Sequence, residues 1–254
     1  MMDLGMTGKT VLVTGGSKGI GAGFCKAYAR QGANVVVNFR SDPEGSMQFV
    51  DTLMDMGASG AVGIQADVSE EADVIRLYDE AIAAFGQVDI LINNAASNKT
   101  YELLDISDEI WDYYMKANLT SAFLMCREFA RRNIGSGRKC HIINILTKAA
   151  FLTTTKGRGC YAASKTGLLG FTRELAVELV EHNIYTNAII PGFVRTPLTE
   201  RLGEEFERKL HRLPMKRAFE SDDLGDTAVF ITSDQCDMML GSVVDLSGGM
   251  MLGF

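Results

Sequence analysis

The sequence has few of the residues that build metal centres and disulfide frameworks. Its 254 residues include 3 histidines and 5 cysteines, and no two cysteines have Cys-x-x-Cys spacing. His141, His182 and His211 lie far apart, so we expect neither a metal site nor a His-based catalytic triad. The scattered cysteines indicate reduced, buried thiols in a cytoplasmic protein. Cys160 adjoins Tyr161 and is a candidate reactive thiol, although we expect it to pack.

The sequence also lacks long apolar runs and an excess of positive charge. No apolar run approaches the roughly 18 residues needed to cross a bilayer, so we expect no membrane association. Residues 1–10 contain Asp3 and no apolar stretch, which is unlike a secretory signal. The formal charge is −7, and no basic stripe with interleaved aromatic residues is present. We therefore expect no nucleic-acid partner.

Short apolar runs alternate with helical patterns along the whole chain. Hydrophobic residues make up 46% and charged residues 22%, as in soluble globular proteins. The expected strands are residues 11–13, 35–37, 61–65, 88–92, 141–146, 186–190 and 242–246. The expected helices are residues 20–31, 47–56, 70–85, 107–129, 161–180, 199–213 and a last one from 221. We predict an α/β fold: a single domain, residues 1–254, with a doubly wound parallel sheet of the Rossmann type. Ser69 and Ser107 are expected to be the N-caps of the third and fourth helices.

A glycine-rich turn joins the first strand to the first helix. Residues 14–21 read Thr-Gly-Gly-Ser-Lys-Gly-Ile-Gly, with glycines spaced Gly-x-x-x-Gly-x-Gly. A strand, a glycine turn and a helix in this order direct backbone N–H groups and a positive helix end at a pyrophosphate. The turn alone is weak evidence, but in this position it predicts a dinucleotide site.

The end of the second strand bears on the choice between NAD and NADP. An NAD site is expected to place Asp or Glu here, to accept from the ribose 2′-hydroxyl. This chain instead has Asn38, followed by Arg40 and Ser41, and Lys18 lies in the glycine turn. Two cations and a hydroxyl suit a 2′-phosphate. We therefore expect NADPH as cofactor, with NAD as the less favoured alternative and solvated surface charges as the alternative interpretation of the two cations.

Tyr161 and Lys165 lie one helical turn apart on the same face of their helix. Free tyrosine has a pKa of about 10, and a cation a few ångströms away lowers it. Reaching about 7 requires roughly 4 kcal/mol of differential interaction, which calls for a partly dry site. The alternative is an amphipathic helix with a tyrosine at the edge of the core and a solvated lysine.

Asn118 interrupts the apolar stripe of the helix expected at 107–129. A buried asparagine needs hydrogen-bond partners, so Asn118 either bonds structurally or holds a water molecule. The expected core positions of this helix are Trp111, Tyr114, Met115, Ala122 and Phe129. The small side chains of residues 93–96, which follow the fourth strand, would let the backbone approach a ligand closely.

Together these segments resemble the short-chain dehydrogenase/reductase family over residues 8–249. In length and in its short lid the chain is similar to the 3-oxoacyl-acyl-carrier-protein reductase-like branch. Each marker is modest, but their order and spacing are highly specific. The markers are residues 14–21, Asp67-Val68, 93–96, Asn118, 161–165, Pro191-Gly192 with Thr196, and 247–249.

The resemblance implies roles for these residues. Tyr161 would protonate the carbonyl oxygen as hydride arrives from NADPH, and Lys165 would bind the nicotinamide ribose and lower the Tyr161 pKa. Asn118 would resupply the proton through its backbone and a water molecule. The substrate would contact Ser97, Thr147, Lys148 and Phe193, under a lid at residues 193–214. The cofactor-binding residues would be Gly15, Ser17, Lys18, Gly19, Ile20, Gly21, Asn38, Arg40, Ser41, Asp67, Val68, Asn94, Ala95, Lys165, Pro191, Gly192, Val194 and Thr196.

The chain departs from the family pattern at the catalytic serine. That serine commonly lies thirteen residues before the tyrosine, which here is Lys148. Counting forward from the end of the fifth strand gives Thr147 instead and requires one inserted residue. We assign Thr147 as the surrogate, because its hydroxyl can also bond a carbonyl oxygen. Lys148 is expected to be displaced outward; the alternative is a second cation that acidifies Tyr161 or binds an anionic substrate.

We expect an NADPH-dependent oxidoreductase that reduces a small-molecule ketone to a secondary alcohol, or the reverse. Lys156 and Arg158 make an acidic or carrier-tethered substrate an alternative to a neutral one. The missing serine also leaves open a catalytically silent NADP-binding sensor or assembly protein. The resemblance implies a homotetramer or homodimer built on the helices at 107–129 and 161–180 and the last strand.

Overall fold

A computed structural model describes residues 4–152, 155–201, 203–211 and 213–252. Within them, parallel strands form one seven-stranded sheet in the order β3-β2-β1-β4-β5-β6-β7. The strands are β1 (Thr10–Val13), β2 (Asn34–Phe39), β3 (Gly60–Gln65), β4 (Ile90–Asn93), β5 (Cys140–Ile145), β6 (Ile184–Pro191) and β7 (Val243–Leu246). The predicted α/β fold is therefore confirmed, with every expected strand placed to within two residues.

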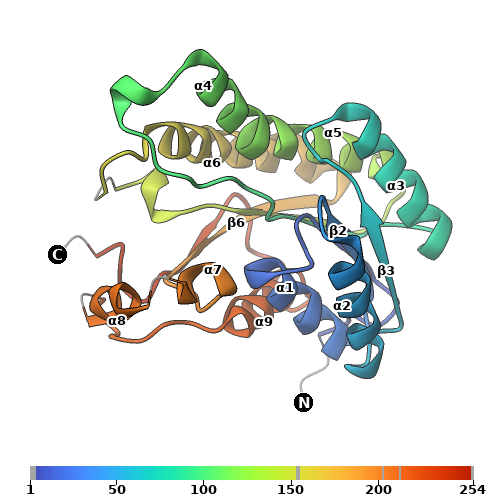
Figure 1. Cartoon of the computed structure of the whole chain (residues 1–254). Helices are drawn as coiled ribbons and strands as arrows, with labels where there is room; N and C mark the ends of the chain where they lie inside the picture. Colours follow the sequence, from blue (N-terminus) through green and yellow to red (C-terminus); the bar gives the residue numbers. More distant parts are fainter. Residues whose placement is uncertain (1–3, 153–154, 202, 212, 253–254) are drawn as a thin grey trace.

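Helices cover both faces of this sheet (Figure 1). One core cluster packs α1 (Gly19–Arg30), α2 (Pro43–Asp55) and α9 (Ser221–Ile231) against one face. A second cluster packs α3 (Glu71–Phe85), α5 (Ser121–Asn133) and α6 (Gly159–Leu179) against the other. Because the strand order reverses between β1 and β4, a crevice is expected outside their carboxyl ends.

Two glycines bring α1 and α9 into backbone contact. A Cβ on Gly23 would lie 2.3 Å from the Ser221 carbonyl oxygen, and one on Gly225 would lie 2.5 Å from that of Gly23. The buried Tyr28 hydroxyl also lies 2.7 Å from Thr232 Oγ1. The helix that follows the glycine turn is thereby fixed to the last helix of the chain.

Several helix boundaries differ from the prediction. The second helix begins at Pro43 rather than 47, because the Asp42 carboxylate accepts from the Gly45 N–H and Pro43 occupies the first turn. Ser69 is not the N-cap of α3; its hydroxyl donates to Asp67 instead, and the N-cap is Glu70. The prediction of Ser107 as an N-cap is confirmed, because its hydroxyl accepts from the Ile110 N–H.

The helix expected at 107–129 divides into α4 (Asp108–Met115), a π-helical turn (Lys116–Thr120) and α5. The extra residue of the π turn shifts the buried stripe. Tyr114, Ala122 and Phe129 are buried as expected, but Trp111 is 44% exposed. The prediction of Trp111 in the core is therefore wrong.

The segment expected as one helix at 199–213 forms two short helices. They are α7 (Pro197–Glu200) and α8 (Glu204–His211). Gly203 between them has φ +53°, a left-handed conformation that ends the first helix.

We predict that His141 makes stability depend on pH. Its ring is buried at the start of β5, and neither ring nitrogen has a hydrogen-bond partner among the described residues. Burial, with Lys139 and Lys9 nearby, lowers its pKa to about 3, against about 6.5 in an unfolded chain. The folded state thus favours the neutral ring. The contribution of His141 to the free energy of unfolding is therefore fully present above pH 6.5 and is lost as the pH falls toward 3. Each pKa unit corresponds to about 1.4 kcal/mol.

Urea unfolding between pH 7 and 5 tests this prediction, because carboxylates mostly titrate below that range. His141→Phe should flatten the fall in unfolding free energy, whereas His182→Asn at a partly exposed site should not. An unchanged slope in the His141 variant would contradict the assignment.

Candidate active site

The glycine turn has the shape that the sequence predicts for a phosphate-binding loop. Gly15 and Gly19 have φ of +59° and +56°, which side chains rarely adopt. A Cβ on Gly21 would lie 2.2 Å from the Gly15 carbonyl oxygen. The first turn of α1 carries no acidic residue, and its N-cap, Lys18, makes no side-chain capping bond. The positive end of α1 is therefore available to an anion, and the loop fits a dinucleotide pyrophosphate.

Buried side chains hold this turn to the carboxyl ends of β1 and β4. The Thr14 hydroxyl accepts from the backbone N–H groups of Asn94 and Ala95, and the Asn94 amide donates to the Thr14 and Gly15 carbonyls. Asn38 accepts from the Gly15 N–H through its Oδ1. Its side chain, expected to contact the cofactor, is instead buried beneath the turn and also donates to Ala66 O. Asn38 and Asn94 thus position the loop through their amides.

The two cations expected at the 2′-phosphate both lie near carboxylates. The Lys18 ammonium donates to Asp42, which has a left-handed φ of +59° at the start of α2. The Arg40 guanidinium lies 3.9 Å from Asp67. Its other neighbour is Tyr113 of α4, whose pKa is lowered by side-chain hydrogen bonds, first to Ser97 and then to Arg40. Sequence reasoning missed both Asp42 and Tyr113, although Asp before Pro is a known helix-start pattern.

Asn118 lies in the π-helical turn, and its side chain is fully buried and bonded. Its Oδ1 accepts from the Ser97 N–H at 2.7 Å, and its Nδ2 donates to Ser97 O and Ser164 Oγ, both at 3.0 Å. Of the two alternatives for Asn118, structural hydrogen bonding rather than holding a water molecule therefore describes its side chain. The π turn is a feature that recurs at functional sites, and here it connects the Ser97 loop with α6.

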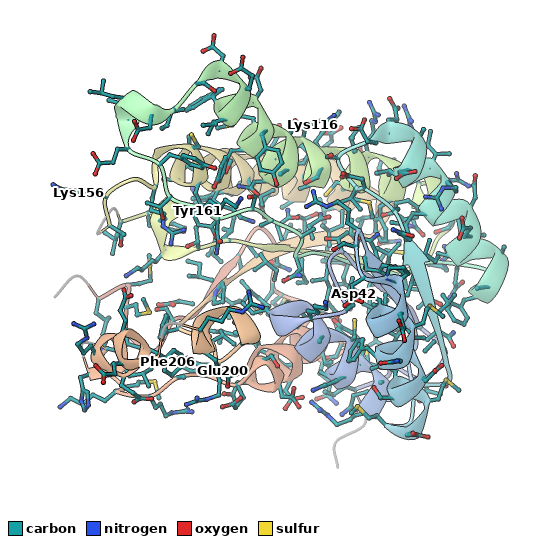
Figure 2. The ribbon with its side chains drawn as sticks, in the orientation of Figure 1. Asp42, Lys116, Lys156, Tyr161, Glu200 and Phe206 are labelled. Carbon is teal, nitrogen blue, oxygen red and sulfur yellow. The ribbon has the colours of Figure 1, made fainter. Side chains whose placement is uncertain are left out.

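Tyr161 is in the first turn of α6, beside a cavity at the carboxyl edge of the sheet. Figure 2 shows it between α6 and the segment that carries Glu200 and Phe206. Burial raises the pKa of its phenol, and a side-chain hydrogen bond to Thr147 and the charge of Arg158 partly offset this. Lys165 is not among the groups that lower it. The prediction of a lowered pKa is therefore wrong for this arrangement: the phenol stays protonated at neutral pH.

Lys165 is 2% exposed, which contradicts the alternative of a solvated lysine. Its ammonium donates to the Ile145 carbonyl at 2.7 Å, so it is directed at the end of β5. Burial lowers its pKa to about 8. A cation buried with one carbonyl partner in the described structure can act on a neighbouring group with little screening.

Thr147 and Lys148 both line the cavity beside Tyr161. The cavity has a volume of about 200 Å³. The Thr147 hydroxyl accepts from the Ala149 N–H at 3.4 Å and is near enough to the Tyr161 phenol to lower its pKa. Lys148 is not displaced outward as expected: it is half-buried in the cavity wall, and burial lowers its pKa. Arg158 lies on the same wall.

The residues after β6 lead from the sheet into the two short helices. The Gly192 position lies close to Phe219, whose ring would be 2.9 Å from a Cβ there. Phe193 packs on Phe206 of α8, with ring centroids 5.0 Å apart. Thr196 caps α7 through a reciprocal pair of bonds with Thr199. The chain after β6 thus leads into α7 and α8, which carry Glu200 and Phe206.

Four comparisons with known proteins agree with this arrangement. A family model described as short chain dehydrogenase matches residues 9–207. The chain is 32% identical over 243 residues to a 3-oxoacyl-acyl-carrier-protein reductase of Staphylococcus epidermidis, covering 95% of this chain and 98% of that one. It is 36% identical to 3beta-hydroxysteroid dehydrogenase 1 of Eggerthella lenta, covering 97% and 95%. A short chain dehydrogenase of Burkholderia cenocepacia, solved in complex with NADP, superposes with a TM-score of 0.89 at 28% identity, covering 96% and 98%.

Proposed function

Because the chain belongs to the short-chain dehydrogenase family and is an oxidoreductase acting on CH–OH or C=O groups, we propose that it reduces a ketone with NADPH. The observation that carries the proposal is the cavity whose wall contains both the Thr147 hydroxyl and the Tyr161 phenol. A protonated phenol beside a second hydroxyl suits a carbonyl oxygen that gains negative charge. The Discussion gives the two experiments that test these groups.

Each of these residues has a separate role in the proposed reduction. The bound nicotinamide supplies the hydride. Tyr161 donates its proton to the carbonyl oxygen, and Thr147 orients that oxygen by hydrogen bonding. Lys165 binds the nicotinamide ribose, because its buried ammonium is directed at the carboxyl end of β5. Asn118 holds the Ser97 loop and Ser164 in place, which positions the start of α6.

NADPH is favoured over NADH because Lys18 and Arg40 lie beside the glycine turn. Asp42 opposes this preference, since its carboxylate engages Lys18. The NADP complex of the Burkholderia relative supports the same choice of cofactor. The remaining proposed cofactor contacts are Ser17, Ile20, Ser41, Val68, Pro191 and Val194.

We predict that Asp42→Asn increases the preference for NADPH about five- to tenfold. Asparagine keeps the helix cap and tolerates the left-handed backbone, while Lys18 becomes available to a 2′-phosphate. The measurement is the ratio of kcat/KM for NADPH to that for NADH. Asp51→Asn, an exposed position on the same helix, is the charge-matched control. A decreased ratio in the Asp42 variant would show that this carboxylate supports NADP binding.

The competing proposal is a catalytically silent NADP-binding sensor or assembly protein, motivated by threonine in place of serine. Screening ketones and 1,2-diketones for NADPH oxidation separates the two. Silence throughout the screen, together with tight cofactor binding, would favour the sensor.

We also propose a homotetramer or homodimer that uses α4, α5, α6 and β7. Phe123 and Val177 are exposed on α5 and α6, Val177 at 73%, which supports this surface. Sedimentation as a monomer would refute it. In the described residues no helix has the length and apolarity to span a bilayer. The buried free cysteines support the proposed cytoplasmic location.

A further inference from the structure

The cavity beside Tyr161 has an unusual charge balance. Its wall includes the cations Lys148 and Arg158, the polar Asn98 and Thr147, and the apolar Leu152. None of the described residues that line it is acidic. The protein has a net charge of −7, yet this small cavity holds two cations and no carboxylate among its described lining residues.

Neither cation is neutralised by the described part of the chain. Other cations of the chain pair with carboxylates, as Lys18 does with Asp42 and Lys116 with Glu70. No described ion pair involves Lys148 or Arg158. Arg158 donates from Nη1 to the Asn98 carbonyl at 2.6 Å, which leaves further N–H donors on its guanidinium. Lys148 is half-buried, and its lowered pKa indicates a cation that an anion would stabilise.

The start of α6 adds to the positive potential. Arg158 is the N-cap of this 21-residue helix, which has no side-chain cap and no acidic residue in its first turn. Positive helix ends favour anions. The helix end, Arg158 and Lys148 are therefore grouped at one cavity.

The same cavity contains the proposed proton donor. Tyr161 lines it, and the Arg158 guanidinium lies 5.7 Å from the Tyr161 ring centroid. A ketone whose oxygen reaches the phenol would therefore place the rest of its carbon skeleton against Leu152, Lys148 and Arg158. The volume of about 200 Å³ suits a short skeleton.

We propose that the substrate is an oxo acid, a short ketone whose carboxylate is bound by Lys148 and Arg158. This inference rests on the proposed ketone reduction and names the class of ketone. Lys148 and Arg158 determine specificity, and Tyr161 and Thr147 act on the carbonyl oxygen. The hydride and the proton both go to the keto group, and the carboxylate is unchanged.

The test compares acetoacetate and 4-oxopentanoate with their methyl esters, in the presence of NADPH. The wild-type protein should favour the acids at least tenfold in kcat/KM. Lys148→Gln and Arg158→Gln should each reduce the acid-to-ester ratio about tenfold, because each removes one cation from the site. Lys156→Gln is the matched control: Lys156 is exposed and lies at the periphery in Figure 2, so this variant should keep the wild-type ratio.

Three outcomes would overturn the inference: esters reduced as well as acids, a neutral thioester preferred to both, or an equal loss in the Lys156 variant. Reduction of a neutral 1,2-diketone together with any of these would leave the proposed ketone reduction intact. If no ketone is reduced, the proposed function fails. Calorimetry then tests separately whether Lys148 and Arg158 bind an anion. Binding of 4-oxopentanoate to the NADP-loaded protein that is lost in Lys148→Gln supports the site, and no binding or unchanged binding overturns it.

Discussion

Tyr161→Phe is expected to reduce ketone reduction by about 10³-fold while leaving cofactor affinity within about threefold. The change removes only the phenol oxygen, so the ring keeps its packing and the proton donor is lost. A positioned acid contributes typically 10²–10⁴-fold; this one lies beside Thr147 in the cavity wall, and its raised pKa keeps it protonated at neutral pH. Steady-state rates with a 1,2-diketone and fluorescence titration with NADPH measure the two quantities.

Tyr185→Phe provides the matched control, because Tyr185 stacks on His141 in β6, away from the cavity. It should reduce ketones at the wild-type rate. If Tyr161→Phe also kept its activity, another group would supply the proton and the mechanism proposed here would be wrong.

Thr147→Val is expected to lower kcat by about 10²-fold with little change in folding stability. Valine has nearly the shape of threonine and lacks the hydroxyl that lies beside the Tyr161 phenol in the cavity wall. Removing one donor that binds a developing oxyanion typically costs 10²–10³-fold. Single-turnover rates, measured with the NADPH-loaded enzyme in excess over the ketone, report the chemical step directly.

Thr147→Ser distinguishes the hydroxyl from the shape of the side chain. Serine restores the hydroxyl and removes the methyl group that restricts χ1, so it should keep at least a third of the activity. Loss of activity in the serine variant, or full activity in the valine variant, would assign the position to packing and would leave Lys148 as the group to examine.

Most of the fold could be predicted because its signals are local and repeated. Buried strands such as 11–13 and 35–37 are apolar runs, and their alternation with helices allows only a parallel sheet covered on both faces. The π turn could not be predicted, because the inserted residue that turns Trp111 outward leaves no mark on helical spacing. The start of α2, in contrast, could have been predicted from the Asp42-Pro43 pair.

The candidate site was predictable in its residues more than in its electrostatics. Spacing placed Tyr161 and Lys165 on one helix face, and counting from the end of β5 placed Thr147 at the cavity. Burial determines the pKa of Tyr161, however, and burial depends on segments far away in the sequence. The same holds for Lys148 and Arg158, which the fold brings into one cavity wall. Their catalytic and binding roles stay predictions.

The contact between α1 and α9 has a consequence for the segment over the site. The chain leaves the sheet where β6 ends at Pro191 and rejoins the packed helices where α9 begins at Ser221, which Gly23 and Gly225 hold against α1. Both ends of the connection are therefore packed into the fold, and we expect a rearrangement that admits or releases a ligand to take place within the connection. A substitution that separates α1 from α9 would free one attachment, so it should alter ligand exchange rates without touching a single residue of the cavity.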